Sequence, residues 1–227
     1  MTPNQSTDRS VARRFPALYP ILDADLVLRG VRPEDRHPLL RRITRAIADA
    51  GVEILQYRNK RDADSVVLDD ALAIREAAGP THPMRLILND RVGLVSAAGW
   101  DGVHVGQEDL PPEQVRSTLG ANAIVGLSTH NDWQVILADK ELIDYIAIGP
   151  IFSTASKEDT SPVIGLDGLR RARALTRKPL VAIGGITLET AASVYEAGAD
   201  SLAVISAIFA PGRDPVQSAK DILEIFK

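Results

Sequence analysis

The sequence predicts a single (β/α)8 barrel, also called a TIM barrel, and three observations carry this prediction. The chain has 227 residues, close to the roughly 250 that are typical of one such barrel. Short apolar runs alternate with longer amphipathic segments along its whole length. Several of these runs are apolar almost throughout, which is typical of parallel strands covered on both faces. An open doubly wound sheet is the alternative fold, but no GxGxxG turn follows the first expected strand.

The expected strands are the short apolar runs, each bounded by glycine, proline or polar residues. In chain order they are ALYPILD (17–23), VEILQYR (52–58), MRLILND (84–90), DGVHVG (101–106), AIVGLST (123–129), DYIAIGPIF (144–152), PLVAIGG (179–185) and DSLAVIS (200–206). Alternation of strands with helices implies right-handed crossovers and a parallel sheet. Eight such units are enough to close the sheet into a barrel.

The longer segments between the strands are expected to be helices. They cover residues 39–50, 62–78, 91–99, 111–120, 131–141, 166–176, 188–198 and 214–226. In the first of them, Leu40, Ile43 and Ile47 fall on one face, as an amphipathic helix requires. Pro111 suits the first turn of the fourth, where no backbone N–H is needed. A further helical start is expected at Ala207, after the last strand.

Composition restricts the class of protein. The net charge of −4 and the pI near 5.6 argue against a nucleic-acid or anionic-membrane partner, because either favours a basic face. The absence of cysteine excludes disulfides and thiolate metal sites. The polar N-terminus lacks the apolar region of a signal peptide, and no apolar run reaches the roughly 18 residues of a membrane span. We expect a cytoplasmic protein, with residues 1–15 as a disordered extension and residues 16–227 as the catalytic barrel. A homo-oligomer is left open.

Polar side chains collect where the expected strands end, which is where such barrels hold their active sites. After the second strand, Gln56, Arg58 and Lys60 alternate, so they point the same way in extended chain. An amide and two cations suit a diphosphate, with arginine as a planar fork and lysine as a point charge. A solvated strand end with a charged turn fits the same pattern. These three residues alone therefore do not distinguish a diphosphate site from an ordinary strand end.

Acidic residues follow the third and fourth strands. Asp90 comes directly after Asn89, and Asp109 follows the fourth strand. Each aspartate could cap the helix after it, which is a common use of this residue. Together they could hold Mg²⁺, which takes one or two carboxylates and completes its shell with water and phosphate oxygens. Both interpretations stay open, although adjacent strand ends converge and make the pair more informative than either residue alone.

Hydroxyl groups follow the fifth and sixth strands. Ser128 and His130 end the fifth strand, and His130 is either an acid–base candidate or an ordinary surface residue. The loop after the sixth strand carries Thr154, Ser156 and Lys157. Hydroxyls followed by a lysine suit phosphate oxygens, and they also fit a plain polar loop.

The last two strands end in Gly184-Gly185 and in Ile205-Ser206. Many barrels bind a phosphate at these two positions with the help of a helix N-terminus. Glycine lets backbone N–H groups approach the anion, because it has no Cβ atom. The sequence therefore predicts a diphosphate and metal site near strands two to four, and a monophosphate site near strands seven and eight.

The ordered set of these segments resembles one known family. QYRNK (56–60), LILNDRV, DGVHVGQEDL, GLSTH, DYIAIGPIFSTASK, VAIGGI and GADSLAVISAI, spread over residues 18–210, are similar to thiamine-phosphate synthases. The resemblance implies a Mg²⁺-dependent transferase. It would join 4-amino-2-methyl-5-(diphosphooxymethyl)pyrimidine to a 4-methyl-5-(2-phosphooxyethyl)thiazole, or its carboxylate, and release diphosphate. The implied partners are small phosphorylated molecules, not nucleic acid or a membrane.

The resemblance also implies a role for each matching residue. The pyrimidine diphosphate would be held by Gln56, Arg58, Lys60, Asn89, Ser128 and Lys157. Mg²⁺ would be bound by Asp90 and Asp109. The thiazole phosphate would be held by Thr154, Ser156, Gly185, Ile205 and Ser206. The catalytic residues among these would be Arg58, Lys60, Ser128 and Lys157. The family usually has Pro-Thr-x-Thr-Lys where this chain has Ser153-Thr154-Ala155-Ser156-Lys157, so the proline is lost but a hydroxyl is kept.

The implied mechanism is a dissociative substitution. No side chain is an obvious nucleophile, and the cationic groups would stabilise the departing diphosphate. Two alternatives remain. A thiazole tautomerase of the same barrel family would use His130 for proton transfer but would have no use for the diphosphate cradle. A non-catalytic phosphate-binding barrel would bind without turnover.

Overall fold

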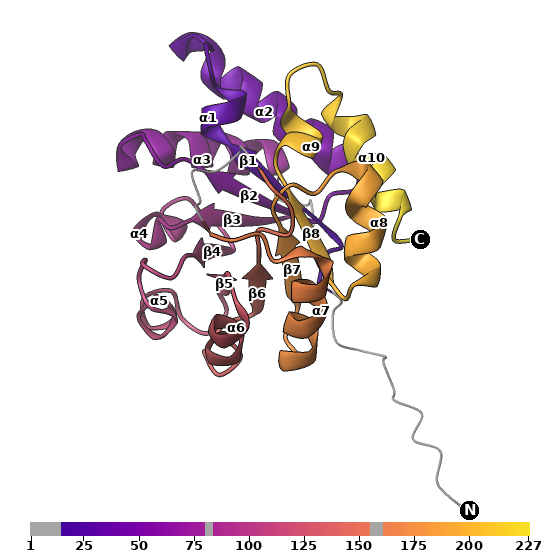
Figure 1. Cartoon of the computed structure of the whole chain (residues 1–227). Coiled ribbons are helices and arrows are strands. Elements are labelled where there is room, and N and C mark those ends of the chain that lie inside the picture. Colours follow the sequence, from indigo (N-terminus) through magenta and orange to yellow (C-terminus); the bar gives the residue numbers. More distant parts are fainter. Residues whose placement is uncertain (1–14, 80–83, 155–160) are drawn as a thin grey trace, which may run out of the picture.

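Eight parallel strands form a closed barrel in the computed structural model of the chain, in the order β1 to β8, with β8 pairing back to β1 (Figure 1). The structure describes residues 15–79, 84–154 and 161–227. Helices connect the strands on the outside, as right-handed crossovers require. The predicted (β/α)8 barrel is confirmed.

The elements follow the predicted alternation closely. The strands are β1 (Leu18–Asp23), β2 (Ile54–Arg58), β3 (Arg85–Asn89), β4 (Gly102–Val105), β5 (Ile124–Thr129), β6 (Tyr145–Ile148), β7 (Leu180–Ile183) and β8 (Ser201–Val204). The helices are α1 (Ala24–Val27), α2 (Pro33–Asp49), α3 (Asp64–Ala78), α4 (Val92–Val95), α5 (Pro112–Leu119), α6 (Asp132–Ala138), α7 (Gly165–Leu175), α8 (Leu188–Glu196), α9 (Ser206–Phe209) and α10 (Pro215–Glu224).

Two helical features differ from the prediction. Helix α2 begins at Pro33 instead of residue 39, because proline fits the first turn and Glu34 and Asp35 complement the positive end of the helix dipole. Pro38 lies inside α2, within the part that the sequence assigns to a loop. The one-turn helix α1 after β1 is not predicted at all, whereas α9 begins at Ser206, one residue before the expected start.

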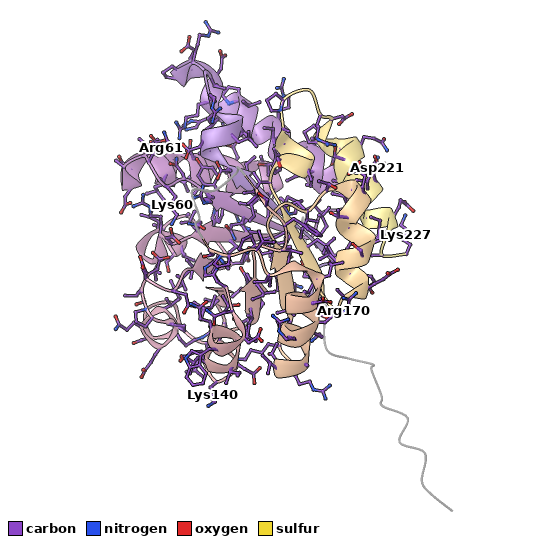
Figure 2. The ribbon with its side chains drawn as sticks, viewed as in Figure 1. Lys60, Arg61, Lys140, Arg170, Asp221 and Lys227 are labelled. Atoms are coloured by element: carbon purple, nitrogen blue, oxygen red, sulfur yellow. The ribbon has the colours of Figure 1, made fainter. Side chains whose placement is uncertain are left out.

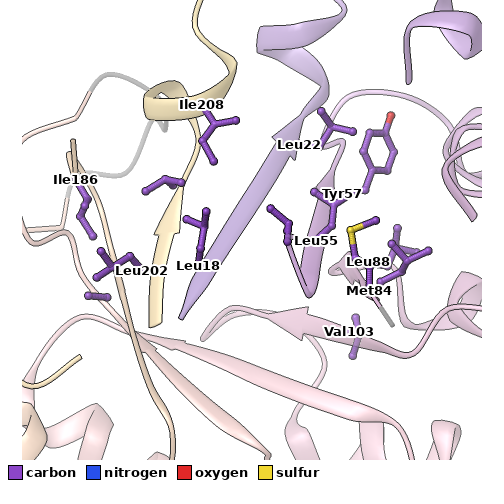
Figure 3. Close-up of a cluster of buried hydrophobic side chains, with 14 of the residues drawn as sticks. Leu18, Leu22, Leu55, Tyr57, Met84, Leu88, Val103, Ile186, Leu202 and Ile208 are labelled. Atoms are coloured by element: carbon purple, nitrogen blue, oxygen red, sulfur yellow. The ribbon is translucent and has the colours of Figure 1, made fainter. Parts of the chain in front are cut away.

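The core has two layers, separated by the alternation of side chains along each strand. One cluster fills the barrel interior and includes Tyr19, Ile87, Tyr145 and Val181. The larger cluster lies between the strands and the helices (Figure 3). The side chains labelled there are Leu18, Leu22, Leu55, Tyr57, Met84, Leu88, Val103, Ile186, Leu202 and Ile208. Most of these are strand residues whose immediate neighbours in sequence face the interior.

The helix ring closes where α10 packs against both α2 and α8. Charged residues such as Lys140, Arg170 and Asp221 lie on the outer side of the molecule (Figure 2). Phe15, assigned to the N-terminal extension from the sequence, is buried and packs against the ring of Tyr145 at a centroid distance of 5.0 Å. The rest of that extension lies outside the described residues. In the described part of the chain, none of the helices combines the length and apolar character needed to cross a membrane.

Candidate active site

The carboxyl-terminal ends of the strands form one end of the barrel, here called the mouth, and the predicted cradle residues lie along it. Gln56 is buried in the barrel, and its amide Nε2 donates to the hydroxyl of Tyr19 at 3.2 Å. Arg58 reaches Asp23 on the neighbouring strand, and Lys60 reaches Asp90 beyond the end of β3. Figure 2 shows Lys60 beside Arg61 on the side of the barrel where α3 and α4 lie.

Asp23 is a partner of Arg58 that the sequence does not reveal. Its carboxylate accepts from the Arg58 guanidinium at 2.5 Å, and the two side chains are only 4% and 14% exposed. The same carboxyl group caps α1 by accepting from the backbone N–H of Leu26 at 3.2 Å. Asp23 ends an apolar run, so its pattern indicates a strand end, but the parallel pairing of β1 with β2 places it opposite Arg58. This contact fixes the guanidinium at the mouth.

A cation and two carboxyl groups meet after β3 and β4. The Nζ atom of Lys60 lies 2.6 Å from Asp90, and the Asp109 carboxyl group is close enough to interact with Asp90 directly. Burial raises the pKa of Asp90 above its ordinary value; Lys60 opposes this shift and Asp109 adds to it. Two carboxylates held this close repel each other, so a cation between them lowers the energy of the site.

Neither aspartate caps a helix, which removes the structural alternative raised by the sequence. The N-cap of α4 is Arg91 and that of α5 is Pro111, and neither helix has a side-chain cap hydrogen bond. Asp90 adopts a left-handed backbone with φ of 62°, which is uncommon for a residue with a Cβ atom. Asp109 instead closes a turn by accepting from the N–H of Gly106 at 2.7 Å. Such a two-carboxylate donor set fits Mg²⁺, which needs no further protein ligand. The residues that the structure describes include no group of three or more His, Cys, Asp or Glu placed to hold a metal.

The loop after β2 is held in place by a partly buried network of polar side chains. The Asn59 side chain accepts from the N–H of Asp62 at 3.1 Å and donates to the Asp62 carboxylate at 3.0 Å. Arg36 of α2 donates to the same carboxylate and, through two nitrogens, to the fully buried Asp70. The Tyr57 hydroxyl also donates to Asp70. Because Lys60 lies within this anchored loop, its position is set by contacts that the sequence pattern does not show.

The ends of β6, β7 and β8 form a second site. Thr154, Gly185, Ile205 and Ser206 line one small pocket, so the structure brings together four of the five residues predicted for a monophosphate. The pocket adjoins a wider cavity of about 490 Å³ that reaches Asp23. Ser206 is the first residue of α9, and the first N–H groups of a helix have no acceptor within it.

Gly185 is required here by its surroundings as well as by its backbone. Its φ is 63°, and a Cβ atom would lie 2.5 Å from the carbonyl oxygen of Ser153 and 2.8 Å from Phe152. The segment after β7 therefore packs directly against the loop after β6. The remaining two residues predicted for this loop, Ser156 and Lys157, lie outside the described residues.

Two more predicted residues lie at strand ends. Asn89 is the buried last residue of β3 and lies opposite His104 in the strand pairing. Ser128 is half-buried at the end of β5. Its hydroxyl lies 2.8 Å from Nε2 of His104, a residue that is not among the predicted site residues. A histidine inside the apolar run GVHV is the signal that could have identified it.

His130 contacts other groups. Its Nδ1 lies 2.8 Å from the carbonyl oxygen of Gly149, and its backbone N–H donates to the side chain of Gln134 at 2.7 Å. These contacts tie the end of β5 to the residue that follows β6 and to α6.

A larger hollow of about 950 Å³ opens at the opposite end of the barrel, between Arg85, Trp100 and Asp101. It lies at the amino ends of the strands, where barrels of this class carry stability and not chemistry. Volume alone therefore does not identify the site, and the chemistry-bearing side chains lie at the mouth.

These features define a (β/α)8 barrel whose mouth combines cations and a carboxylate pair on one side with a glycine-lined pocket on the other. A family model described as thiamine monophosphate synthase matches residues 19–208. The chain belongs to this family, which confirms the resemblance found in the sequence.

Relatives with this family name are similar over most of their length. The chain is 48% identical to the thiamine-phosphate synthase of Koribacter versatilis, covering 93% of this chain and 96% of that protein. It is 39% identical to the thiamine-phosphate synthase of Chloroflexus aurantiacus, covering 85% of each. Among solved structures, the thiamine phosphate pyrophosphorylase of Pyrococcus furiosus has a TM-score of 0.78 at 29% identity, covering 92% of this chain and 94% of that one.

Proposed function

We propose that this protein is a thiamine-phosphate synthase. It joins 4-amino-2-methyl-5-(diphosphooxymethyl)pyrimidine to 4-methyl-5-(2-phosphooxyethyl)thiazole and releases diphosphate; with the carboxylate of that thiazole as substrate, CO2 is released as well. The observation that carries this proposal is that one mouth holds two unlike groups of residues, one with cations and a carboxylate pair, the other a small pocket lined by glycine. Two phosphorylated substrates held face to face can react without diffusing apart. Family membership supports the same reaction, which is a group transfer.

The pyrimidine diphosphate belongs on the β2 to β5 side. Arg58 and Lys60 supply the positive charge for the diphosphate, and Gln56, Asn89 and Ser128 supply hydrogen bonds. Lys157 lies outside the described residues, and its role in this site rests on the family resemblance. Asp90 and Asp109 would hold Mg²⁺, which when bound would offset the charge of the diphosphate oxygens.

The thiazole phosphate belongs on the β6 to β8 side. Thr154 and Ser206 offer hydroxyl groups, and the backbone at Gly185 and Ile205 lets the phosphate approach closely. Ser156 is the fifth residue proposed for this site. The small size of the pocket suits one phosphate group and leaves the thiazole ring toward the centre of the mouth.

The reaction asks for charge stabilisation more than for proton transfer. The bond between the pyrimidine methylene carbon and the diphosphate oxygen breaks, and both electrons leave with the diphosphate. The aminopyrimidine ring delocalises the positive charge left on the methylene carbon. The thiazole nitrogen then donates its lone pair to that carbon and forms the new C–N bond. Arg58 and Lys60 act throughout by stabilising the leaving group.

The proposal is tested by incubating the purified protein with both substrates, with and without Mg²⁺, and measuring thiamine phosphate and diphosphate by mass spectrometry. Mg²⁺-dependent formation of both products is expected in equal amounts. Tight binding of both substrates without turnover would instead identify a non-catalytic phosphate-binding barrel. Isomerisation of a thiazole carboxylate phosphate without any coupling would identify a tautomerase. We further propose that the enzyme works in the cytoplasm on small phosphorylated molecules.

A further inference from the structure

Five polar side chains form one continuous chain of hydrogen bonds through the barrel interior. Gln56 Nε2 donates to the Tyr19 hydroxyl at 3.2 Å, and that hydroxyl lies 2.8 Å from the hydroxyl of Tyr145. The Tyr145 hydroxyl lies 2.9 Å from Nδ1 of His104, and Nε2 of His104 lies 2.8 Å from the Ser128 hydroxyl. The chain crosses β2, β1, β6, β4 and β5. It therefore links Gln56 and Ser128, both proposed for the pyrimidine diphosphate site, through the barrel interior.

Ser128 is the most exposed of these five side chains. The other four side chains are between 0% and 7% exposed, whereas Ser128 is half-buried. The His104 and Tyr145 rings are stacked with centroids 5.5 Å apart. Tyr145 occupies space that Gly126 leaves free, because a Cβ atom at Gly126 would lie 2.0 Å from the tyrosine ring. Buried polar groups of this kind need each other as partners, since little water reaches them.

Each hydroxyl group in this chain of hydrogen bonds has one hydrogen to donate. Counting these hydrogens shows which group is the donor in each bond. The Tyr19 oxygen accepts from the Gln56 amide, so the single hydrogen of Tyr19 is left for Tyr145. Tyr145 then has its own hydrogen for Nδ1 of His104. Burial raises the pKa of both tyrosines, so both hydroxyls keep their hydrogens at neutral pH. A neutral His104 that accepts at Nδ1 carries its hydrogen on Nε2 and donates it to Ser128.

We propose that His104 is a positioning residue that presents the Ser128 hydroxyl as a hydrogen-bond donor to the pyrimidine diphosphate substrate. Because His104 occupies one lone pair of the Ser128 oxygen, the hydroxyl hydrogen is left for an acceptor in the mouth. Both ring nitrogens of His104 are engaged inside the protein, so it acts through Ser128 and not on the substrate. This inference rests on the proposed function for the identity of the ligand. It adds to that function a buried histidine that orients the Ser128 hydroxyl toward the substrate.

The tautomer of His104 is measured in the protein without substrates. Long-range ¹H–¹⁵N correlation spectra of protein labelled in its four histidines distinguish the two neutral tautomers. The spectrum of His104→Gln identifies which signals belong to His104. We expect the hydrogen on Nε2 and a bare, accepting Nδ1. The opposite tautomer would mean that Ser128 donates to His104, which overturns the inference without touching the proposed function.

A double-mutant cycle tests whether His104 acts through Ser128. His104→Ala should lower kcat roughly three- to tenfold, the range expected when one hydrogen bond is lost. It should leave the KM for the thiazole phosphate unchanged, because that substrate binds on the other side of the mouth. In a Ser128→Ala background the same change should have an effect of less than about twofold, since the group it positions is gone. His104→Gln, which can still donate to Ser128, should recover part of the lost rate.

Two controls separate this inference from the proposed function and from simple destabilisation. His130→Gln changes a histidine two residues beyond Ser128 and should retain the kcat of the unmodified protein. If His104→Ala does not fold, Tyr145→Phe removes the hydroxyl that lies beside both Nδ1 of His104 and the Tyr19 hydroxyl but keeps the aromatic ring, and it should shift the His104 signals and lower kcat. Full additivity of the His104 and Ser128 substitutions would overturn the inference. Absence of coupling activity in the unmodified protein would overturn the proposed function, whereas the tautomer measurement would still decide the direction of the chain.

Discussion

Replacing Arg58 by alanine should lower both stability and turnover, and a second substitution should separate the two effects. The structure pairs Arg58 with Asp23, whose side chain is 4% exposed. Removing the guanidinium leaves that carboxylate buried without its partner, which typically destabilises a protein by about 3–5 kcal/mol. For a chain of 227 residues, each kcal/mol shifts the melting temperature by about 2–4 °C. The expected fall for Arg58→Ala is therefore roughly 6–20 °C.

The double variant Asp23→Asn with Arg58→Ala has no buried carboxylate without a partner. It should therefore recover most of the melting temperature that Arg58→Ala loses. Turnover should not return, because the guanidinium proposed to hold the diphosphate is still missing. A charge-assisted hydrogen bond contributes about 1.5–3 kcal/mol, and each 1.36 kcal/mol is a tenfold change in rate. The expected loss of kcat/KM is therefore roughly 10- to 150-fold in both variants.

The assay pairs thermal unfolding followed by circular dichroism with thiamine phosphate formation at a temperature where both variants are folded. Near-normal turnover in the double variant would show that Arg58 serves only to neutralise Asp23. An unchanged melting temperature in Arg58→Ala would refute the argument from the buried ion pair.

Three further predictions address the rest of the site. Asp90→Asn and Asp109→Asn should each raise the Mg²⁺ concentration needed for half-maximal rate, because an amide binds Mg²⁺ more weakly than a carboxylate. The melting temperature should stay nearly unchanged. Early unfolding with unaltered Mg²⁺ dependence would contradict this prediction. Ser206→Asp should abolish thiazole phosphate binding in calorimetry but preserve pyrimidine diphosphate binding, and equal loss of both ligands would argue against two separate sites. His130→Ala should still form thiamine phosphate at much of the normal rate, whereas Lys157→Ala should lose most of it. The reverse pattern would favour a tautomerase, in which acid–base catalysis contributes roughly 10²–10⁴-fold.

The strand ends were predictable because their positions depend only on local pattern. Apolar runs bounded by glycine and proline locate β1 to β8 within a few residues, and the (β/α)8 fold then brings Gln56, Arg58 and Asp90 to one mouth. The start of α2 was not predictable in the same way. Pro33 and Pro38 both lie in it, and a pair of prolines in sequence is more typical of a loop.

The partners of the site residues depend on which strands are neighbours and in what register. Asp23 faces Arg58 because β1 and β2 pair with those two residues opposite each other. His104 reaches both Ser128 and Tyr145 only because β4, β5 and β6 are adjacent in the closed sheet. Local sequence carries no information on such contacts, so the charges of the mouth were visible from the sequence but the groups that orient them were not.

Gly126 has a consequence for how this protein can change over evolutionary time. A Cβ atom at position 126 would lie 2.0 Å from the present Tyr145 ring, so alanine there requires the tyrosine to move or to be replaced. A descendant that acquires a side chain at position 126 must therefore shift or lose the ring at position 145. Loss of that tyrosine also removes the hydroxyl that lies beside Nδ1 of His104. A single glycine thus restricts which substitutions are tolerated at a neighbouring position in this half of the barrel.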